Sequence, residues 1–117
     1  MSGPVVTAIT LHQASRRLEV GFDTGEVFFL SCEYLRVNSP SAEVQGHGPD
    51  QRVLVYGKRD VNIVGIDQVG HYGVLLRFDD GHDTGIFSWQ TLYQLGREQA
   101  ENWDHYLAEL DAAGRSR

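Results

Sequence analysis

The spacing of apolar residues changes near residue 89, and this change limits the folds that the chain can adopt. Before it, Leu18, Val20 and Phe22 alternate with Arg, Glu and Gly, which is the two-residue period of a half-buried strand. From Trp89 onward a mostly apolar stripe recurs at steps of three and four residues, as on one face of a helix. The stripe consists of Leu92, Leu95, Gln99, Trp103, Tyr106, Leu107 and Leu110. Strands followed by a long C-terminal helix predict an α+β domain.

Short runs rich in β-branched and aromatic residues predict an antiparallel β-sheet of about five or six strands. Residues 17–30 form a predicted hairpin, because Asp23-Thr24-Gly25 separates two such runs. Further along, Asp80-Gly81 indicates a type I′ turn. The β-rich segments from which these strands are expected to form are 5–12, 17–22, 26–30, 53–56, 62–69, 74–78 and 84–87.

Helix boundaries are indicated by serine, proline and glycine. Residues 31–37 could form a helical turn, and a short helix is predicted to follow, with Ser39 as its N-cap and Pro40 at its first position. Gly46 would end this helix after Gln45. Ser88 is the expected N-cap of the long helix, which is predicted over about 89–113 and ends at Gly114.

The whole-chain composition excludes several classes of protein. A length of 117 residues suits one hydrophobic core, so residues 1–117 are expected to form a single domain. The net charge of −6 argues against nucleic-acid binding, which needs a basic face. The single Cys32 provides no disulfide and no cysteine pair, and a buried position is expected for it. Because neither a signal segment nor a membrane-spanning run is present, we expect a cytoplasmic protein that does not bind membranes.

Two segments, residues 35–47 and 78–89, are long enough to indicate a family. Together with Leu92-Tyr93 they closely resemble the gamma-butyrobetaine hydroxylase-like N-terminal domain, over about residues 8–95. Small bacterial proteins of this family have been catalogued as a domain of unknown function. The residues of the two segments that carry the resemblance include Arg36, Asn38, Pro40, Glu43, Asp80, Gly81 and Trp89.

The resemblance implies a zinc site that this chain has lost. In the hydroxylases the domain precedes an iron- and 2-oxoglutarate-dependent catalytic domain, and it holds zinc with three cysteines and one histidine. On this chain the cysteine positions fall on Ser39, Ser41 and Val44, and the histidine falls on His82. Neutral hydroxyls are poor zinc ligands and valine is none, so no cofactor is expected at these degenerate positions.

Two interpretations of His82 remain open from the sequence. The first is a zinc or iron site formed by His82 and Asp83, with His47 as a third ligand. The second, which we favour, is that His82 hydrogen-bonds to the 39–41 segment and so replaces the link that zinc makes in the hydroxylases. Adjacent residues of an extended chain project to opposite sides, which argues against the pairing of His82 with Asp83 on one metal.

We do not expect an enzyme, because the sequence contains no self-sufficient catalytic constellation. It lacks a nucleophile elbow, and the Asp79-Asp80 pair lies in a predicted turn, where solvent keeps both carboxyls ionised. The first functional hypothesis is therefore a binding or adaptor module with an unknown protein partner. The resemblance links it to oxygenase or iron–sulfur biology, because related domains are attached to hydroxylases and to ATPases that carry iron–sulfur clusters. Its alternative is a small metal-binding protein that uses His82 and Asp83. Trp89, Tyr93, Trp103 and Tyr106 are expected to be core aromatics, although Trp89 beside Phe87 could border a groove.

Overall fold

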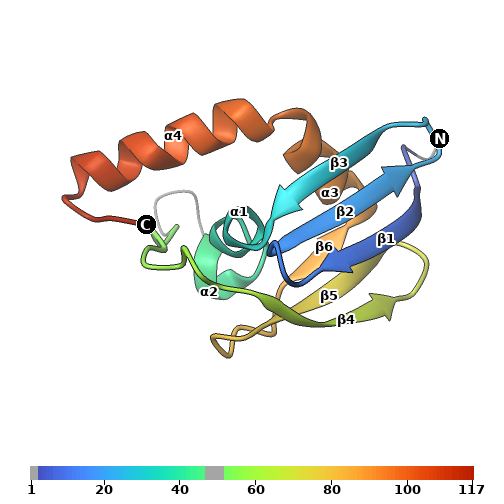
Figure 1. The fold of residues 1–117 in the computed structure, drawn as a ribbon, viewed down its shortest axis with the longest axis horizontal. Helices are drawn as coiled ribbons and strands as arrows, with labels where there is room; N and C mark the ends of the chain where they lie inside the picture. The colour runs from blue at the N-terminus through green and yellow to red at the C-terminus, as the bar shows by residue number, and fades with distance from the viewer. Residues whose placement is uncertain (1–2, 47–51) are drawn as a thin grey trace.

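The computed structural model describes residues 3–46 and 52–117. Within them the chain forms an α+β fold of six antiparallel strands, as predicted, although the strands divide between two three-stranded sheets (Figure 1). One sheet has the order β1 (Val6–His12), β2 (Arg17–Phe22) and β3 (Val27–Ser31), and the other has β4 (Ile63–Val69), β5 (Gly73–Phe78) and β6 (Ile86–Ser88). The helices are α1 (Cys32–Val37), α2 (Ala42–Gln45), α3 (Trp89–Arg97) and α4 (Gln99–Ala112).

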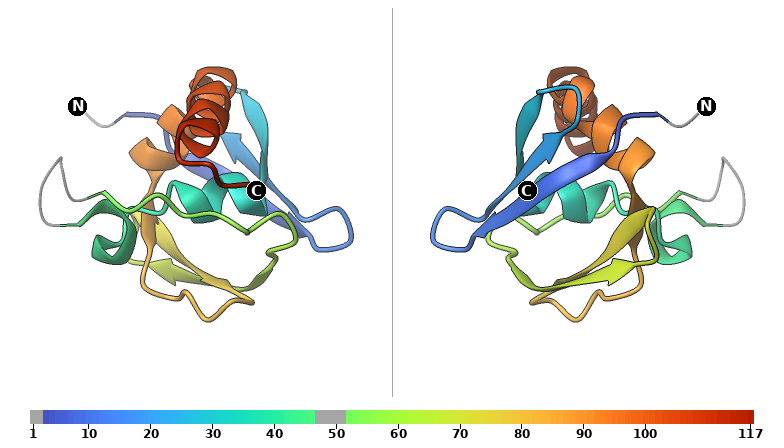
Figure 2. Two further views of the ribbon diagram at one scale, coloured as in Figure 1. Left: turned by 90° about the vertical axis from the view of Figure 1, so that its left-hand side faces the viewer. Right: turned by 90° about the vertical axis from the view of Figure 1, so that its right-hand side faces the viewer.

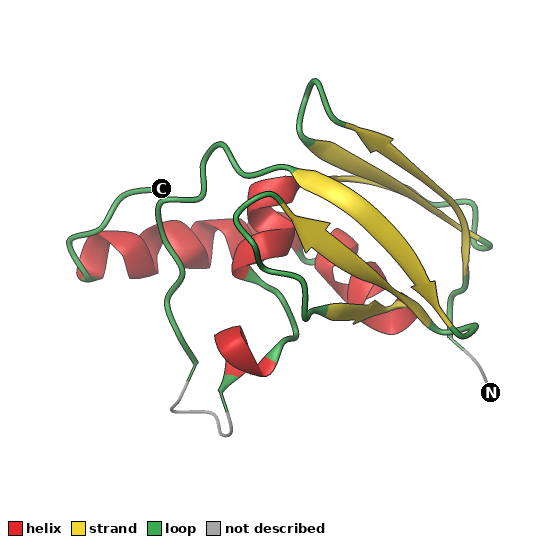
Figure 3. Cartoon of the chain, turned by 90° about the horizontal axis from the view of Figure 1, so that it is seen from below, coloured by secondary structure: helices red, strands yellow, loops and turns green. Residues whose placement is uncertain are grey.

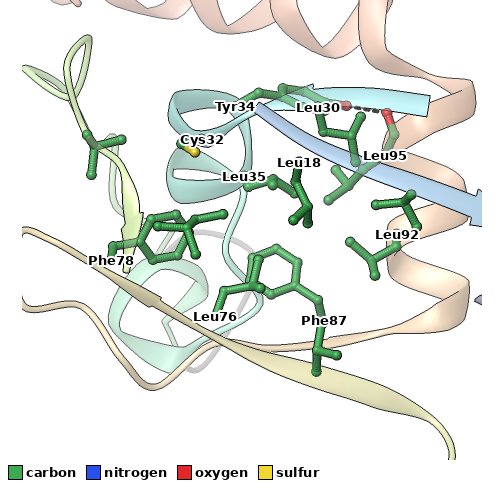
Figure 4. Packing of buried hydrophobic residues seen from close by; sticks show 14 of the residues in the cluster. Leu18, Leu30, Cys32, Tyr34, Leu35, Leu76, Phe78, Phe87, Leu92 and Leu95 are labelled. Atoms are coloured by element: carbon green, nitrogen blue, oxygen red, sulfur yellow. Dashed lines mark hydrogen bonds between the residues drawn. The ribbon is translucent and has the colours of Figure 1, made fainter. Parts of the chain in front are cut away.

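The hydrophobic core lies between the two sheets. The alternating residues Leu18, Val20 and Phe22 of β2 are all buried, as the two-residue period predicts. They belong to one cluster with side chains of the second sheet, such as Leu76 and Phe87. Figure 2 shows α1 between the sheets. Figure 4 shows its residues meeting those of α3 in the core. This core also contains Leu30, Tyr34, Leu35, Ile63, Leu92 and Leu95.

Serine side chains cap three of the helices. Ser31 Oγ accepts the Tyr34 N–H at 3.0 Å at the start of α1, and Ser88 Oγ accepts the Thr91 N–H at 3.1 Å at the start of α3. The prediction that Ser39 caps the short helix is wrong. The cap of α2 is Ser41, whose Oγ accepts the Glu43 N–H at 3.2 Å.

The predicted single C-terminal helix over 89–113 is also wrong, since α3 ends at Arg97 and α4 begins at Gln99. Between them Glu98 leaves the helical conformation, with φ −104° and ψ 17°. The break is explained by packing, because the two helices contribute side chains to different hydrophobic clusters. The residues of α3 enter the main core, whereas Tyr106 and Leu110 of α4 form a second cluster with Val37, Leu54 and Val55.

The prediction that the residues of the stripe share one packed face of the helix holds only in part for α4. Trp103 is half-buried and touches both clusters, but Leu107, which the stripe assigns to the same packed face of the helix, is 38% exposed. No helix within residues 3–46 and 52–117 is long and apolar enough to cross a lipid bilayer.

The connection from α2 to β4 contains no strand in its described part, so the prediction of a strand over 53–56 is wrong (Figure 3). Val53 and Tyr56 are half-exposed, and the Val55 carbonyl accepts a hydrogen bond of 2.8 Å from the Tyr106 hydroxyl instead of joining a ladder. The segment therefore acts as a packing surface for α4.

The turn after β5 also differs from the prediction. A type I′ turn needs positive φ at both central residues, but of the Asp80-Gly81 pair only Gly81 has it, at 90°. The Gly81 N–H donates to the Phe78 carbonyl at 3.2 Å, so Gly81 takes the last position of the turn and its left-handed conformation leads the chain back toward His82.

Candidate functional site

His82 lies at the contact between the two motif segments. Its side chain is only 2% exposed, Nε2 lies 2.9 Å from Ser39 Oγ, and Nδ1 lies 2.9 Å from Glu43 Oε2. A carboxylate can only accept, so Nδ1 donates to Glu43, and Nε2 of the neutral ring accepts from the Ser39 hydroxyl. The prediction that His82 hydrogen-bonds to the 39–41 segment is confirmed.

Further hydrogen bonds extend this contact, which we call the motif seam, along residues 36–43 and 80–85. Ser39 Oγ accepts the Ser41 N–H at 3.3 Å, and Ser41 Oγ lies 2.6 Å from Thr84 Oγ1. A side chain at Gly85 would collide with Ser39 Oγ, so glycine permits the close approach of the two segments. Both serines that the resemblance aligns with cysteines therefore hold the second segment through hydroxyl groups.

A cluster of charged side chains lies at one end of the motif seam. Arg36 Nε lies 2.8 Å and Lys58 Nζ lies 2.7 Å from Asp80 Oδ2, while the His82 N–H donates to Asp80 Oδ1 at 3.1 Å. Partial burial alone would raise the pKa of Asp80. The hydrogen bonds from Lys58, the His82 backbone and Arg36 outweigh this effect and lower the pKa to about 2. Asp80 is thus an ionised anchor for two cations and one turn amide.

The order Glu43, His82, Ser39 is the hydrogen-bond order of a catalytic carboxylate–histidine–serine triad. A serine nucleophile must reach a substrate carbonyl, however, and Ser39 is 0% exposed. Its hydroxyl is also in contact with both His82 and the Ser41 N–H. The arrangement therefore joins two segments and offers no access to a substrate.

The residues present do not fit the zinc site that the resemblance implies. Val44 is buried and has no donor atom, and Ser39 and Ser41 are engaged as hydroxyls. Over residues 3–46 and 52–117, no group of three or more His, Cys, Asp or Glu side chains is arranged to hold a metal ion. Asp83 is exposed beside the buried His82, and His47 lies outside the described residues.

Cys32 is buried, as predicted, with 0% exposure and its Sγ 3.7 Å from Asn62 Oδ1. Burial raises the pKa of this thiol, so the reactive thiolate form is disfavoured.

Comparison with known protein families shows which family contains these two motif segments. The model of the family described as gamma-butyrobetaine hydroxylase-like, N-terminal, matches residues 9–93, which include the whole motif seam. The chain belongs to this family.

Solved structures of similar proteins agree with the fold of this gamma-butyrobetaine hydroxylase-like N-terminal domain. Two NMR solution structures are 55% and 48% identical in sequence, with TM-scores of 0.86 and 0.85; each alignment covers 99% of this chain, and 86% and 91% of the other chain. A crystal structure from Acidithiobacillus ferrooxidans, described as a protein of unknown function in the DUF971 family, is 38% identical with a TM-score of 0.68. That alignment covers 81% of this chain and 98% of the other. No curated protein matches the sequence significantly.

In this family member, the sequence did not single out two residues that the structure places in or beside the motif seam. Lys58 lies outside both motif segments, and only the folded chain brings it to Asp80. Thr84 could have been found, because it follows His82 by two residues and therefore faces the same side of an extended chain.

A groove of about 710 Å³ lies on a different part of the domain, where Trp89 begins α3. Tyr72, Trp89 and Tyr93 line it together with Pro4 and Val5, and among residues 3–46 and 52–117 no Asp, Glu, Lys or Arg lines it. The Trp89 indole N–H donates to the His71 carbonyl at 2.8 Å, which fixes the ring, whereas Tyr72 is 55% exposed. Trp89 and Tyr93 also pack against the main core, so the expected core position and the groove that was left open for Trp89 both hold. We call this feature the aromatic groove.

Proposed function

We propose that this domain is a non-catalytic protein-binding module that receives its partner at the aromatic groove. The observation that carries the proposal is the concentration of three aromatic rings in one groove whose described lining contains no Asp, Glu, Lys or Arg. Aromatic side chains are enriched at protein interfaces, because they bury a large area at low cost in side-chain entropy.

The internal hydrogen bonds of the polar motif residues support the same proposal. His82 uses both ring nitrogens, and the Ser39 and Ser41 hydroxyls are also engaged, so these groups hold the domain together. The alternative of a zinc or iron protein gains no support from these contacts, since a metal at His82 would have to displace Ser39 or Glu43. Because of the family resemblance, oxygenases and iron–sulfur proteins are the first partners to test.

Affinity capture with matched variants tests this function. Tyr72→Ala removes an exposed ring from the aromatic groove, and Tyr56→Ala removes a ring of similar exposure, 47%, that does not line it. We expect the wild-type domain and Tyr56→Ala to retain the same partner protein from a lysate of the source cells, and Tyr72→Ala to lose it. Retention of the same proteins by all three baits, or of none above an empty support, would contradict the proposal.

A further inference from the structure

Glu33 is a buried carboxylate that the motif seam does not use. It lies on α1, and its side chain is 4% exposed. A buried carboxylate is costly unless a cation and hydrogen bonds compensate it. Here the compensation comes from Arg117, whose Nη2 lies 2.7 Å from Glu33 Oε1 and whose Nε lies 3.2 Å from Oε2. The carboxylate thus receives the two-nitrogen contact that a guanidinium fork provides.

Trp103 completes the surroundings of this guanidinium. The Arg117 Cζ atom lies 5.1 Å from the centroid of the Trp103 ring, within the range of a cation–π contact. A planar cation is therefore held between a carboxylate and an indole face, a combination that suits guanidinium better than a rounder, more strongly hydrated ammonium.

The Arg117 guanidinium is partly exposed to solvent, and a short segment of chain connects it to α4. Arg117 is 36% exposed, and it borders a pocket of about 450 Å³ that Tyr34, Ala100 and Trp103 also line. The residues that lead to it are held by two backbone hydrogen bonds, from the Arg115 N–H to the Leu110 carbonyl at 2.9 Å and from the Gly57 N–H to the Ser116 carbonyl at 3.3 Å. The Arg115 guanidinium also lies over the Tyr56 ring. An incoming side chain could reach Glu33 from the pocket once Arg117 leaves.

We propose that Glu33 and Trp103 form an arginine-binding site, which Arg117 fills within the chain and which an arginine of a partner protein can occupy in its place. The chain's own side chain shows which chemical group the site accepts, and the adjoining pocket leaves room for the residues beside a partner's arginine. The site uses α1 and α4, not the aromatic groove, so it can fail or succeed independently of the function proposed above.

NMR titration with Nα-acetyl-arginine N-methylamide tests the site directly. The chain has two tryptophans, so the indole N–H of Trp103 reports on the site and that of Trp89 serves as an internal reference. In Arg117→Ala we expect a saturable shift of the Trp103 signal only. In the wild type, the tethered Arg117 competes at an effective concentration in the millimolar range, so binding should be weaker by roughly tenfold or more.

Two controls separate recognition of arginine from general association. The citrulline analogue has nearly the same shape but no charge, and it should give no saturable shift. The double variant Glu33→Gln/Arg117→Ala should likewise not respond to the arginine probe. If Arg117→Ala is poorly folded, Arg117→Gln replaces it, and a rise of its melting temperature with the probe is a second readout. A folded Arg117 variant that fails to bind the probe, or that binds citrulline equally, would overturn the proposal.

Discussion

Each ring nitrogen of His82 has a partner from the other motif segment, and this makes the residue hard to replace. Truncation to alanine leaves the Ser39 hydroxyl without its acceptor inside the protein. Orphaned buried polar groups typically cost about 1–3 kcal/mol. We therefore expect His82→Ala to lower the free energy of unfolding by about that amount in urea denaturation.

The neighbouring Asp83 supplies the control for His82. It is exposed, and surface substitutions away from special features usually change stability by less than about 0.5 kcal/mol. Equal stability of His82→Ala and Asp83→Ala would show that the motif seam contributes nothing through His82.

Asp80 predicts an acid-dependent part of the stability. Its pKa falls from 3.8 to about 2 in the folded chain, so the unfolded state binds more protons than the folded state between these values. The contribution of Asp80 is present above about pH 4 and is lost as the pH falls toward 2. Urea denaturation over this range should therefore show a smaller loss for Asp80→Asn than for the wild type, while Asp83→Asn keeps the wild-type slope.

At the level of elements, α4 is attached through one face. Trp103 touches both hydrophobic clusters, whereas Leu107 is on the outer side of the helix. Removing a large core side chain costs about 3–5 kcal/mol when it is fully buried, and Trp103 is half-buried. We expect Trp103→Ala to lower the free energy of unfolding by about 2–4 kcal/mol in chemical denaturation, which leaves a poorly folded protein. A Leu107→Ala variant with the same loss would contradict the observed orientation of the helix.

The pairing of β5 with β6 requires glycine at its first position. A Cβ atom on Gly73 would lie 2.6 Å from the Phe87 carbonyl oxygen, which belongs to the backbone of the paired strand. The strands would have to separate to accept it, and such overpacking costs about 1–3 kcal/mol. Gly73→Ala should therefore melt well below the wild type, and Gly3→Ala, which meets no atom within 4 Å, should not. Equal melting temperatures would show that β6 can shift freely.

For the whole molecule, the hydrogen bonds of the motif seam predict stability without a metal. The positions that the resemblance aligns with zinc ligands are filled by two engaged hydroxyls, a buried valine and His82. A structural zinc ion contributes folding energy directly, so its removal lowers the melting temperature by many degrees. We expect protein purified without an affinity tag to melt at the same temperature with and without a strong chelator. Stoichiometric zinc or iron in that protein, together with a large drop in chelator, would favour the metal-binding alternative.

Much of the local structure follows from the sequence, because short-range rules act within a few residues. The alternation of apolar and polar residues correctly predicted that Leu18, Val20 and Phe22 face the buried side of β2. Ser88 was correctly predicted as the N-cap of the helix that begins at Trp89. The contact between His82 and Ser39 was predicted as well, but only from the resemblance, which implies that zinc joins the same two distant segments in the hydroxylases.

Packing between distant segments decided the remaining features. Ser39 and Ser41 both satisfy the local rule for a helix cap, and the buried His82 engages Ser39, so Ser41 caps α2. The stripe from Leu92 to Leu110 has one continuous helical period, yet its two halves meet different clusters, and the helix breaks at Glu98. A sequence pattern states which residues share a face. Which surface that face meets depends on the positions of segments far away in the chain, and these exist only once the chain has folded.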